Sequence, residues 1–482
     1  MSEIETATSP PALPVDERRD VRGSPATSGL LLVLLCAVQF LDGMDVSAMG
    51  TALPRIQRDL GMSAGALQWV VSAYVLGYGG FLLLGGRMAD LLTRRRLLVG
   101  SLLTFTVASC AGGLAGAGGV LVAARLVLGI SAAFSAPTAL AILLDTYRDE
   151  AARNRALGAF AATGAAGFVL GLVLGGALAG ISWRLTLLVP GGVALVVAAA
   201  VQRVVPSGGV RPEGRGRLDL PGALTVTSGV LLLVYGVTHA STAGWADSAT
   251  VTSLAAAVVL IAGFVQVERT TRSPLVPLDT FRRPQLAHAN ACALLFQGTY
   301  VAFQFLATLY YQDELGWSPF QTGLAFLLGG VIVVFASPRF AAAVGRTGAW
   351  PLVVAGLALQ AVSYVWFVLW FDRVDGVVLV LVQQALGGLG WAATYTALNI
   401  TAVSNARDHE QGLVSAMFIA AIQIGSGVVL AVVASVYAAS SDAGLGGYRA
   451  GGWTVVTVSV VTTLLAGLGV VRNRRAAPAD AA

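Results

Sequence analysis

The chain has 482 residues, of which 56% are hydrophobic and only 11% are charged. Because an average soluble protein carries about 25% charged residues, this composition excludes a water-soluble enzyme, a nucleic-acid-binding domain and a disordered chain. The formal net charge is +5 and all 30 basic residues are arginine, so their placement decides whether they form a patch for a polyanion.

Apolar runs long enough to cross a bilayer as helices, which takes about 20 residues each, recur along the whole chain. They predict an all-α integral membrane protein, with a disordered cytoplasmic tail at residues 1–28 and a short one at residues 472–482. Fourteen spans are expected, at residues 29–52, 66–85, 97–117, 119–144, 155–180, 185–205, 218–239, 249–267, 287–311, 321–340, 349–371, 377–400, 411–438 and 452–471.

The arginines indicate which loops face the cytoplasm. The loops after every second span, together with both termini, hold 24 of the 30, and the loops on the other side hold five. Short loops rich in basic residues stay in the cytoplasm, so both termini of this multi-pass chain are predicted to lie on the cytoplasmic side of the plasma membrane. The remaining arginine, Arg125, lies inside the fourth span.

The spans divide into two sets of six, with two more between them. Gly86–Arg96 follows the second span and Pro338–Arg346 follows the tenth; both are short basic hairpins, and they align when Arg346 is laid on Arg94. We therefore expect an N-terminal six-helix bundle at residues 29–205 and a C-terminal one at residues 287–471, the parallel repeat that transporters use. Residues 206–286 would be a linker with two extra transmembrane helices.

Five short motifs follow one another on successive spans. They are Asp45 with Ala52–Pro54; Gln68, Trp69 and Tyr74; Gly86, Asp90, Arg94 and Arg95; Arg125, Gly129 and Pro137; and Gly164, Gly167, Gly171, Gly175 and Gly176. In this order they resemble the major facilitator superfamily, specifically its fourteen-helix drug:proton antiporters, over residues 29–471. Two departures are Thr93, where the loop motif of the family has glycine, and Leu172, where its helix-5 motif has proline.

The resemblance implies the superfamily fold and a secondary active transporter that exports lipophilic drugs or antibiotics in exchange for protons by alternating access. Its partners would be a small organic substrate, protons and the lipid bilayer, with the proton gradient in place of a cofactor, and the chain would be a monomer. Leu172 keeps open an alternative, a proton-coupled uptake carrier or uniporter of a small organic solute. The sequence has no pattern typical of a metal site, a catalytic cluster or a nucleotide-binding loop, so we expect neither an enzyme nor a nucleic-acid partner.

Asp42 and Asp45 lie in the first span, where inserting an acidic residue costs about 2.5–3.5 kcal/mol. At positions i and i+3 they share one helix face, which must look into the bundle or a wet cavity, where a carboxyl can hold a proton near neutral pH. Arg125 lies ~9 Å below the outer edge and Asp45 ~10 Å below it, at 1.5 Å per residue, so the two can pair. We predict that these three residues couple transport to protons; a static ion pair between the two spans is the alternative.

Conformational gating is predicted for the motif after the second span, and the resemblance implies a latch between helices there. A plain basic loop would explain its arginines as well. The residues assigned to the latch are Gly86, Asp90, Arg94 and Arg95.

A glycine face on the fifth span is the second candidate for gating. Gly167, Gly171 and Gly175 recur every four residues, a pattern that permits close helix approach. Such a face suits either static packing or two halves that rock against each other.

Polar and aromatic stripes on the ninth and twelfth spans are the candidate substrate cavity. At helical spacing they form surfaces that suit flat, amphipathic organic molecules. Interfacial aromatics and helix–helix hydrogen bonds are the alternative. The predicted cavity residues are Gln297, Tyr300, Gln304, Gln384, Trp391 and Tyr395, with Tyr311 at the end of the first stripe.

Overall fold

The computed structural model describes residues 25–147, 149–205, 219–271, 284–404, 411–440 and 445–476. The predicted N-terminal tail lies outside these residues as far as residue 24, as do most of the polar segments beside the two extra helices. The first helix begins at Pro25 and the last ends at Ala476, so helical structure extends by about a turn into each of the predicted tails. A helix can continue past the hydrocarbon into water because its backbone hydrogen bonds are internal.

Fourteen α-helices and one short π-helix make up the described residues, which contain no strand. Twelve of these helices are long and apolar enough to cross a membrane. The other two are α2 and α7, and the apolar stretch described in α7, Pro221–Val237, is shorter. The all-α membrane fold is therefore confirmed, while crossings by α2 and α7 stay predictions. The helices are α1 (Pro25–Leu60), α2 (Ala64–Leu91), α3 (Arg94–Gly113), α4 (Gly118–Thr146), α5 (Glu150–Ile181), α6 (Leu185–Val204), α7 (Leu220–Ala243), α8 (Ser248–Thr270), α9 (Pro284–Leu309), η2 (Tyr310–Glu314), α10 (Pro319–Thr347), α11 (Ala349–Trp370), α12 (Gly376–Ser404), α13 (Gln411–Ala439) and α14 (Gly446–Ala476).

Capping residues define where several helices begin and end. Ser63 before α2 accepts a hydrogen bond from the N–H of Ala66 at 3.2 Å, and Asp149 before α5 accepts one from Ala152 at 2.9 Å. These side chains satisfy donors that the first helical turn leaves free. Gly348 separates α10 from α11 with a φ of 79°, a conformation open to glycine without strain, so a single residue makes the turn.

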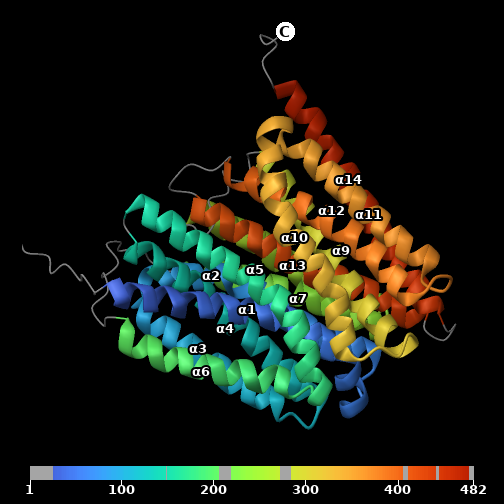
Figure 1. The fold of residues 1–482 in the computed structure, drawn as a ribbon, viewed down its shortest axis with the longest axis horizontal. Helices are drawn as coiled ribbons and strands as arrows, with labels where there is room; N and C mark the ends of the chain where they lie inside the picture. Colours follow the sequence, from blue (N-terminus) through green and yellow to red (C-terminus); the bar gives the residue numbers. More distant parts are fainter. Residues whose placement is uncertain are drawn as a thin grey trace, which may run out of the picture.

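The helices form two groups that diverge like the arms of a V (Figure 1). Helices α1–α6 pack with one another, and so do α9–α14; the groups meet where α1 contacts α9 and α10, α2 contacts α13, and α5 contacts α10. We call the end where α1 finishes and α14 begins the closed end. The other end, where α1 begins and α14 finishes, is the open end.

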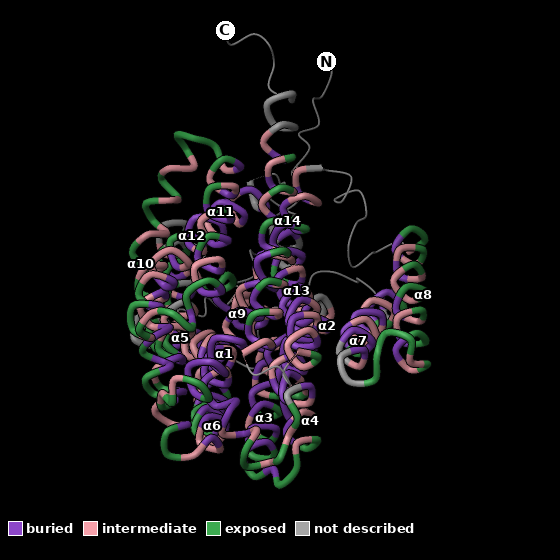
Figure 2. Tube along the Cα trace, turned by 90° about the vertical axis from the view of Figure 1, so that its right-hand side faces the viewer, coloured by how far each residue is buried: buried purple, intermediate pink, exposed green. Residues whose placement is uncertain are grey.

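Helices α7 and α8 form a hairpin beside the two groups, on the side away from α5 and α10 (Figure 2). Helix α8 packs on α7, and α7 also packs on α2 and α13. Asp247 begins α8 by accepting hydrogen bonds from the N–H groups of Ala249 and Thr250, and it lies 3.2 Å from His239 Nε2 at the end of α7. These contacts close the hairpin.

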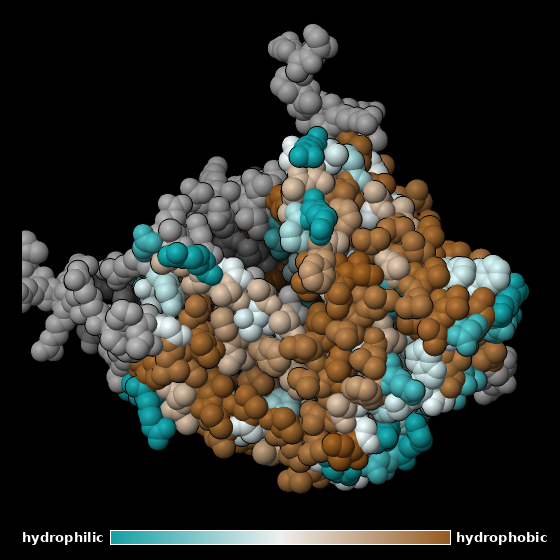
Figure 3. Space-filling model, in the orientation of Figure 1, coloured by the Kyte–Doolittle hydropathy of each residue, from teal (hydrophilic) through white to brown (hydrophobic). Residues whose placement is uncertain are grey.

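The face of the molecule seen in Figure 3 is mostly hydrophobic, with polar side chains gathered toward its margins. Large apolar side chains are freely exposed on the helices, as Val107 on α3 (70%) and Phe335 on α10 (66%) show. Exposed apolar surface on this scale is that of a protein in contact with lipid.

Candidate functional site

A buried ion pair joins α1 to α4. Arg125 Nη1 donates to Asp45 Oδ2 at 2.5 Å, and both side chains are only 1% exposed. Arg125 Nε donates to the carbonyl oxygen of Val70 at 2.9 Å, and the guanidinium carbon lies 4.5 Å from the centre of the Tyr74 ring. The structure thus brings together the two residues whose depths match in the sequence, and α2 supplies the further contacts that a buried arginine requires.

Sequence reasoning missed the role of α2 in this pair. Tyr74 belongs to a motif, but no spacing rule connects it with Arg125, and a backbone carbonyl such as that of Val70 leaves no signal in a sequence. The α2 and α4 backbones lie so close together that a Cβ built at Gly129 would meet the Tyr74 backbone. This close packing brings Val70 and Tyr74 to Arg125.

Asp42 lies one turn before Asp45 on α1 and has a different environment. Its side chain is 5% exposed, and within the described chain its Oδ2 accepts no hydrogen bond and the carboxylate has no ion-pair partner. An ionised carboxylate that is buried and unpaired is costly. Arg125 therefore compensates one of the two buried acids of α1, while the other is left available for a proton or a cation.

The turn between α2 and α3 is anchored to the neighbouring helices of its own group. The Arg94 guanidinium forms an ion pair with Asp145 near the end of α4 and donates to the carbonyl oxygen of Ala141 at 3.1 Å. Arg95 donates to the carbonyl oxygen of Gln202 in α6. Asp145 was missed because it lies 51 residues from Arg94, and no spacing rule spans such a distance.

The other two residues of the predicted latch, Asp90 and Gly86, have no described contact that supports it. The Asp90 side chain lies outside the described residues, so its place in a latch remains a prediction. A Cβ at Gly86 would meet nothing within 4 Å, so no close contact in this conformation requires glycine there.

The predicted glycine face of α5 packs against α1. A Cβ at Gly171 would lie 2.8 Å from Met44 Cα, one at Gly175 would lie 2.5 Å from Ala48 Cβ, and one at Gly167 would also collide with the α1 backbone. Real Cβ atoms do not approach so closely, so the two backbones can meet only because these side chains are absent. The close packing is thus observed; a role in motion stays a prediction.

Four of the predicted cavity residues form one connected set between α9 and α12. Trp391 Nε1 donates to Gln297 Oε1 at 3.3 Å, and the Trp391 ring stacks on Tyr395 with centroids 4.6 Å apart. Tyr300 lies 6.2 Å from Trp391 and, on its other side, 6.3 Å from Phe168 of α5. Phe168 links the set to the other group of helices, and nothing in the apolar sequence around it singled it out.

The remaining residues of the two stripes lie outside this connected set. Gln304 and Gln384 each have a side-chain nitrogen that is buried and has no partner in the described chain, which suits a polar group of a ligand. Tyr311 is wrong as an extension of the stripe: it is fully buried, and its ring packs on Trp317 and Phe326. The chain changes to a π-helix at residue 310, so the 3.6-residue period no longer predicts where the next side chains point.

The two groups are joined at the closed end. Gln312 Nε2 donates to the carbonyl oxygen of Thr51 at 2.8 Å, and a Cβ at Gly176 would lie 3.0 Å from Phe320 Cα. Toward the open end the helices part: after Gly330, no residue of α10 is buried. Among the described residues, the space between the groups is therefore closed at one end and not at the other.

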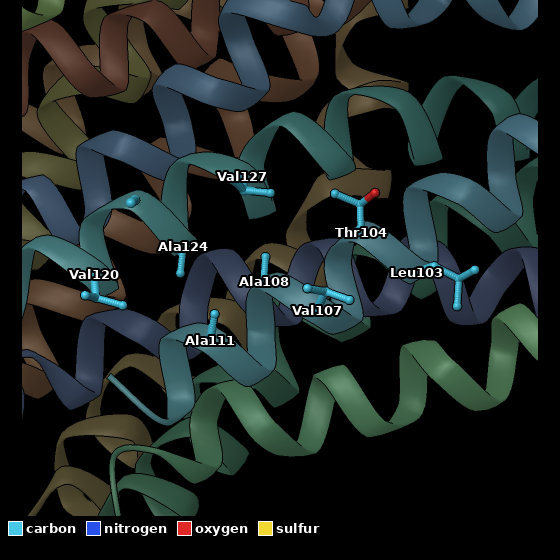
Figure 4. A pocket seen from close by; sticks show the side chains of 9 residues that line it. Leu103, Thr104, Val107, Ala108, Ala111, Val120, Ala124 and Val127 are labelled. Carbon is cyan, nitrogen blue, oxygen red and sulfur yellow. The ribbon is translucent and has the colours of Figure 1, made fainter. Parts of the chain in front are cut away.

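A separate groove of about 530 Å³ lies between α3 and α4 (Figure 4). Its lining is almost wholly apolar and includes Leu103, Val107, Val120 and Val127, all of which are exposed on the outer surface. Its lining includes neither Asp42 and Asp45 nor any residue of the aromatic set, so it is a lipid-facing groove and no part of the candidate site.

Comparison with known proteins decides the family. The profile of the Major Facilitator Superfamily matches residues 35–430. The chain belongs to the Major Facilitator Superfamily. It is therefore a membrane transporter of a family that carries small organic substrates, and not an enzyme.

The relatives include antibiotic exporters and resistance proteins. The cephamycin export protein CmcT of Amycolatopsis lactamdurans is 35% identical over 85% of this chain and 85% of its own length. The puromycin resistance protein pur8 of Streptomyces alboniger is 36% identical over 84% of this chain and 81% of its own length. The lincomycin resistance protein of Streptomyces lincolnensis is 32% identical over 91% of this chain and 89% of its own.

Solved structures agree on the fold. A bacterial homologue of the human lysosomal transporter Spinster, in an inward-facing and unoccupied conformation, superposes with a TM-score of 0.68 over 94% of this chain and 98% of that one, at 15% identity. The POT family transporter PepTSo superposes with a TM-score of 0.66 at 16% identity, over 91% of this chain and 98% of that chain. At such identities the likeness establishes the fold alone.

Proposed function

We propose that the chain exports lipophilic organic compounds, antibiotics among them, across the plasma membrane in exchange for protons. The observation that carries this proposal is the pair of buried acids on α1, of which Arg125 compensates Asp45 and leaves Asp42 unpaired. Ionisable groups inside a membrane protein mark proton relays and ion pathways. Relatives named for cephamycin export and for resistance to puromycin and lincomycin support export as the direction.

In the proposed cycle, protonation changes how α1 is held. A proton on Asp45 removes the charge that Arg125 neutralises, and α1 is then bound less tightly to α4. Asp42 takes either a proton or a cationic group of the substrate, so the two compete. The aromatic set around Trp391 and the free amides of Gln304 and Gln384 hold the organic part.

Alternating access completes the proposal. In this proposal the chain is a monomer with fourteen crossings. The arginine distribution supports a cytoplasmic position for both termini and for the open end, so this conformation would be the inward-open one. Contacts such as that of Gln312 with Thr51 close the outer end and would break as the two six-helix bundles, residues 29–205 and 287–471, rock outward. The glycine face of α5 and the Arg94 anchor would guide that movement.

The proposal is tested in proteoliposomes with an acidic lumen. Puromycin and lincomycin should accumulate inside until an uncoupler removes the pH gradient. Asp45→Asn should abolish the gradient-driven accumulation. Asp59→Asn is the matched control, because Asp59 is on the same helix but pairs with Arg184 at 2.5 Å outside the site. Normal gradient-driven accumulation by the Asp45→Asn variant would contradict the proposal.

An uptake carrier or uniporter is the second candidate, and Leu172 is the observation that favours it. In place of the helix-breaking proline of the antiporter motif, Leu172 continues α5 and its backbone lies against Gly323 of α10. Reversing the pH gradient separates the candidates. An exporter moves substrate against the proton flow, a symporter moves it along that flow, and a uniporter is unaffected.

A further inference from the structure

The two seams between the helix groups are covered unequally. The α2/α13 seam is where Gly79 approaches Gln423, with 2.9 Å between a Cβ built at Gly79 and the Gln423 Cβ. The α5/α10 seam runs from Gly176 to Val169 on α5. In Figure 2 the two seams lie on opposite sides, with the α7–α8 hairpin on the α2/α13 side.

Helix α7 covers the α2/α13 seam and holds both of its helices. Thr227 Oγ1 of α7 donates to the carbonyl oxygen of Gly80 in α2 at 2.6 Å. Val234 of α7 is 1% exposed and lies 3.5 Å from a Cβ built at Gly427 in α13. A buried cluster of α7 side chains with Leu76 of α2 fills the space between. Lipid is therefore kept away from this seam.

The α5/α10 seam has no such cover among the described helices. Toward the open end, a Cβ built at Gly330 would lie 2.7 Å from Val169 Cγ2. The two helices carry exposed apolar side chains, which are Leu170, Leu174, Phe320, Leu324, Val331, Val334 and Phe335. Figure 3 shows this face as mostly hydrophobic.

An aromatic path leads inward from this seam. Phe168, next to Val169, contacts Tyr300, which contacts Trp391, which stacks on Tyr395. The rings therefore connect the lipid-facing seam with the candidate cavity. Aromatic faces accept flat apolar groups at any point along such a path.

We propose that substrate enters this transporter sideways, as an amphipathic molecule dissolved in the membrane, through the α5/α10 seam alone, while the α7–α8 hairpin keeps the opposite seam shut. The inference rests on the proposed function for its substrate class. Transfer of apolar surface from water to lipid is favourable, so such molecules are more concentrated in the membrane than beside it. An entrance in the lipid takes them where they are most abundant.

The test uses a membrane-confined photoreactive probe, 3-(trifluoromethyl)-3-(m-iodophenyl)diazirine, with the full chain in vesicles. Light should label peptides that contain Tyr300 and Trp391. Gly330→Phe fills the seam and should lower that labelling at least fivefold. Gly263→Phe is the matched control, because it adds the same side chain on α8 where a Cβ meets nothing within 4 Å. Unchanged labelling of the Leu464 peptide, which faces lipid, shows that each variant is folded.

Interior labelling that Gly330→Phe leaves unchanged, or that both variants lower equally, would overturn the entrance. The seal is tested by adding Val230→Ala and Val234→Ala to Gly330→Phe: interior labelling should recover as the second seam opens, and no recovery would overturn the role of α7. If Gly330→Phe unfolds the chain, Val169→Phe fills the same place from α5. It should lower the interior labelling in the same way, and unchanged labelling would overturn the entrance. Labelling needs neither a proton gradient nor turnover, so failure of this inference is distinct from failure of proton-driven export.

Discussion

Removing the arginine from the buried ion pair is the perturbation whose effect the structure defines best. Arg125→Met takes away the 2.5 Å contact with Asp45, the hydrogen bond to the carbonyl oxygen of Val70 and the contact with the Tyr74 ring. Methionine fills part of the space but leaves the Asp45 carboxylate buried without a partner. Breaking a buried pair in this way costs about 3–5 kcal/mol, and we expect the free energy of unfolding to fall by that amount.

The double variant separates the ion pair from simple loss of packing. Asp45→Asn combined with Arg125→Met leaves no uncompensated charge, so it should recover about 2 kcal/mol or more relative to Arg125→Met alone. Unfolding by denaturant in mixed micelles, at fixed pH and lipid content, measures the free energy of unfolding of each variant. Arg55→Met is the control: Arg55 donates to the carbonyl oxygens of Ala179 and Gly180 at the closed end, and its loss leaves no buried charge.

Two results would refute this reasoning. One is a loss of stability in Arg125→Met no larger than that in Arg55→Met. The other is a double variant no more stable than Arg125→Met, which would mean that the charge of Asp45 is already compensated by groups other than the arginine.

Three further predictions address the rest of the molecule. Gly175→Ala should cost about 1–3 kcal/mol of stability through overpacking against Ala48. Gly158→Ala is the control and should cost nothing, because a Cβ there meets open space on the same helix. Equal effects of the two substitutions in thermal unfolding would count against the close α1–α5 packing. Arg94→Ala should change stability by less than about 1 kcal/mol, since the pair with Asp145 is partly exposed, yet slow transport several-fold; wild-type turnover would remove Arg94 from gating. The N–H groups of Thr250 and then Ala249, together with His239, lower the pKa of Asp247. The ionised Asp247 side chain therefore stabilises the folded protein fully above the pKa that it has in the unfolded chain. This stabilisation is lost as the pH falls through the lower pKa of the folded protein. Protection of the amides in the first turn of α8 against hydrogen exchange, taken relative to the intrinsic exchange rate at each pH, should fall only in that acidic range, and Asp247→Asn should abolish this fall.

The length of the apolar runs was enough to predict the helical membrane fold, because the bilayer imposes that length on any helix that crosses it. The pairing of Asp45 with Arg125 was predictable for a related reason. A charge inside a membrane needs a partner, and depth along a helix follows from residue count. These are constraints that act on single residues and can be read one helix at a time.

Contacts that depend on how helices meet could not be predicted in the same way. Asp145, Val70 and Phe168 lie on helices whose neighbours are set by packing in three dimensions. Tyr311 was misplaced because a local π-helix altered the period on which the stripe depended. The unequal cover of the two seams also has no sequence signal, since the apolar residues of α7 look like those of any other lipid-facing helix.

Proton movement on addition of substrate tests the central claim most directly. Proteoliposomes holding a fluorescent pH indicator, with no initial gradient, receive puromycin outside; entry of the drug through the antiporter should expel protons and make the lumen more alkaline than in protein-free vesicles. The account predicts this signal for the wild-type chain and for Asp59→Asn, and its loss in Asp45→Asn. Transport of puromycin without any protein-dependent proton movement, or an undiminished signal in Asp45→Asn, would contradict it.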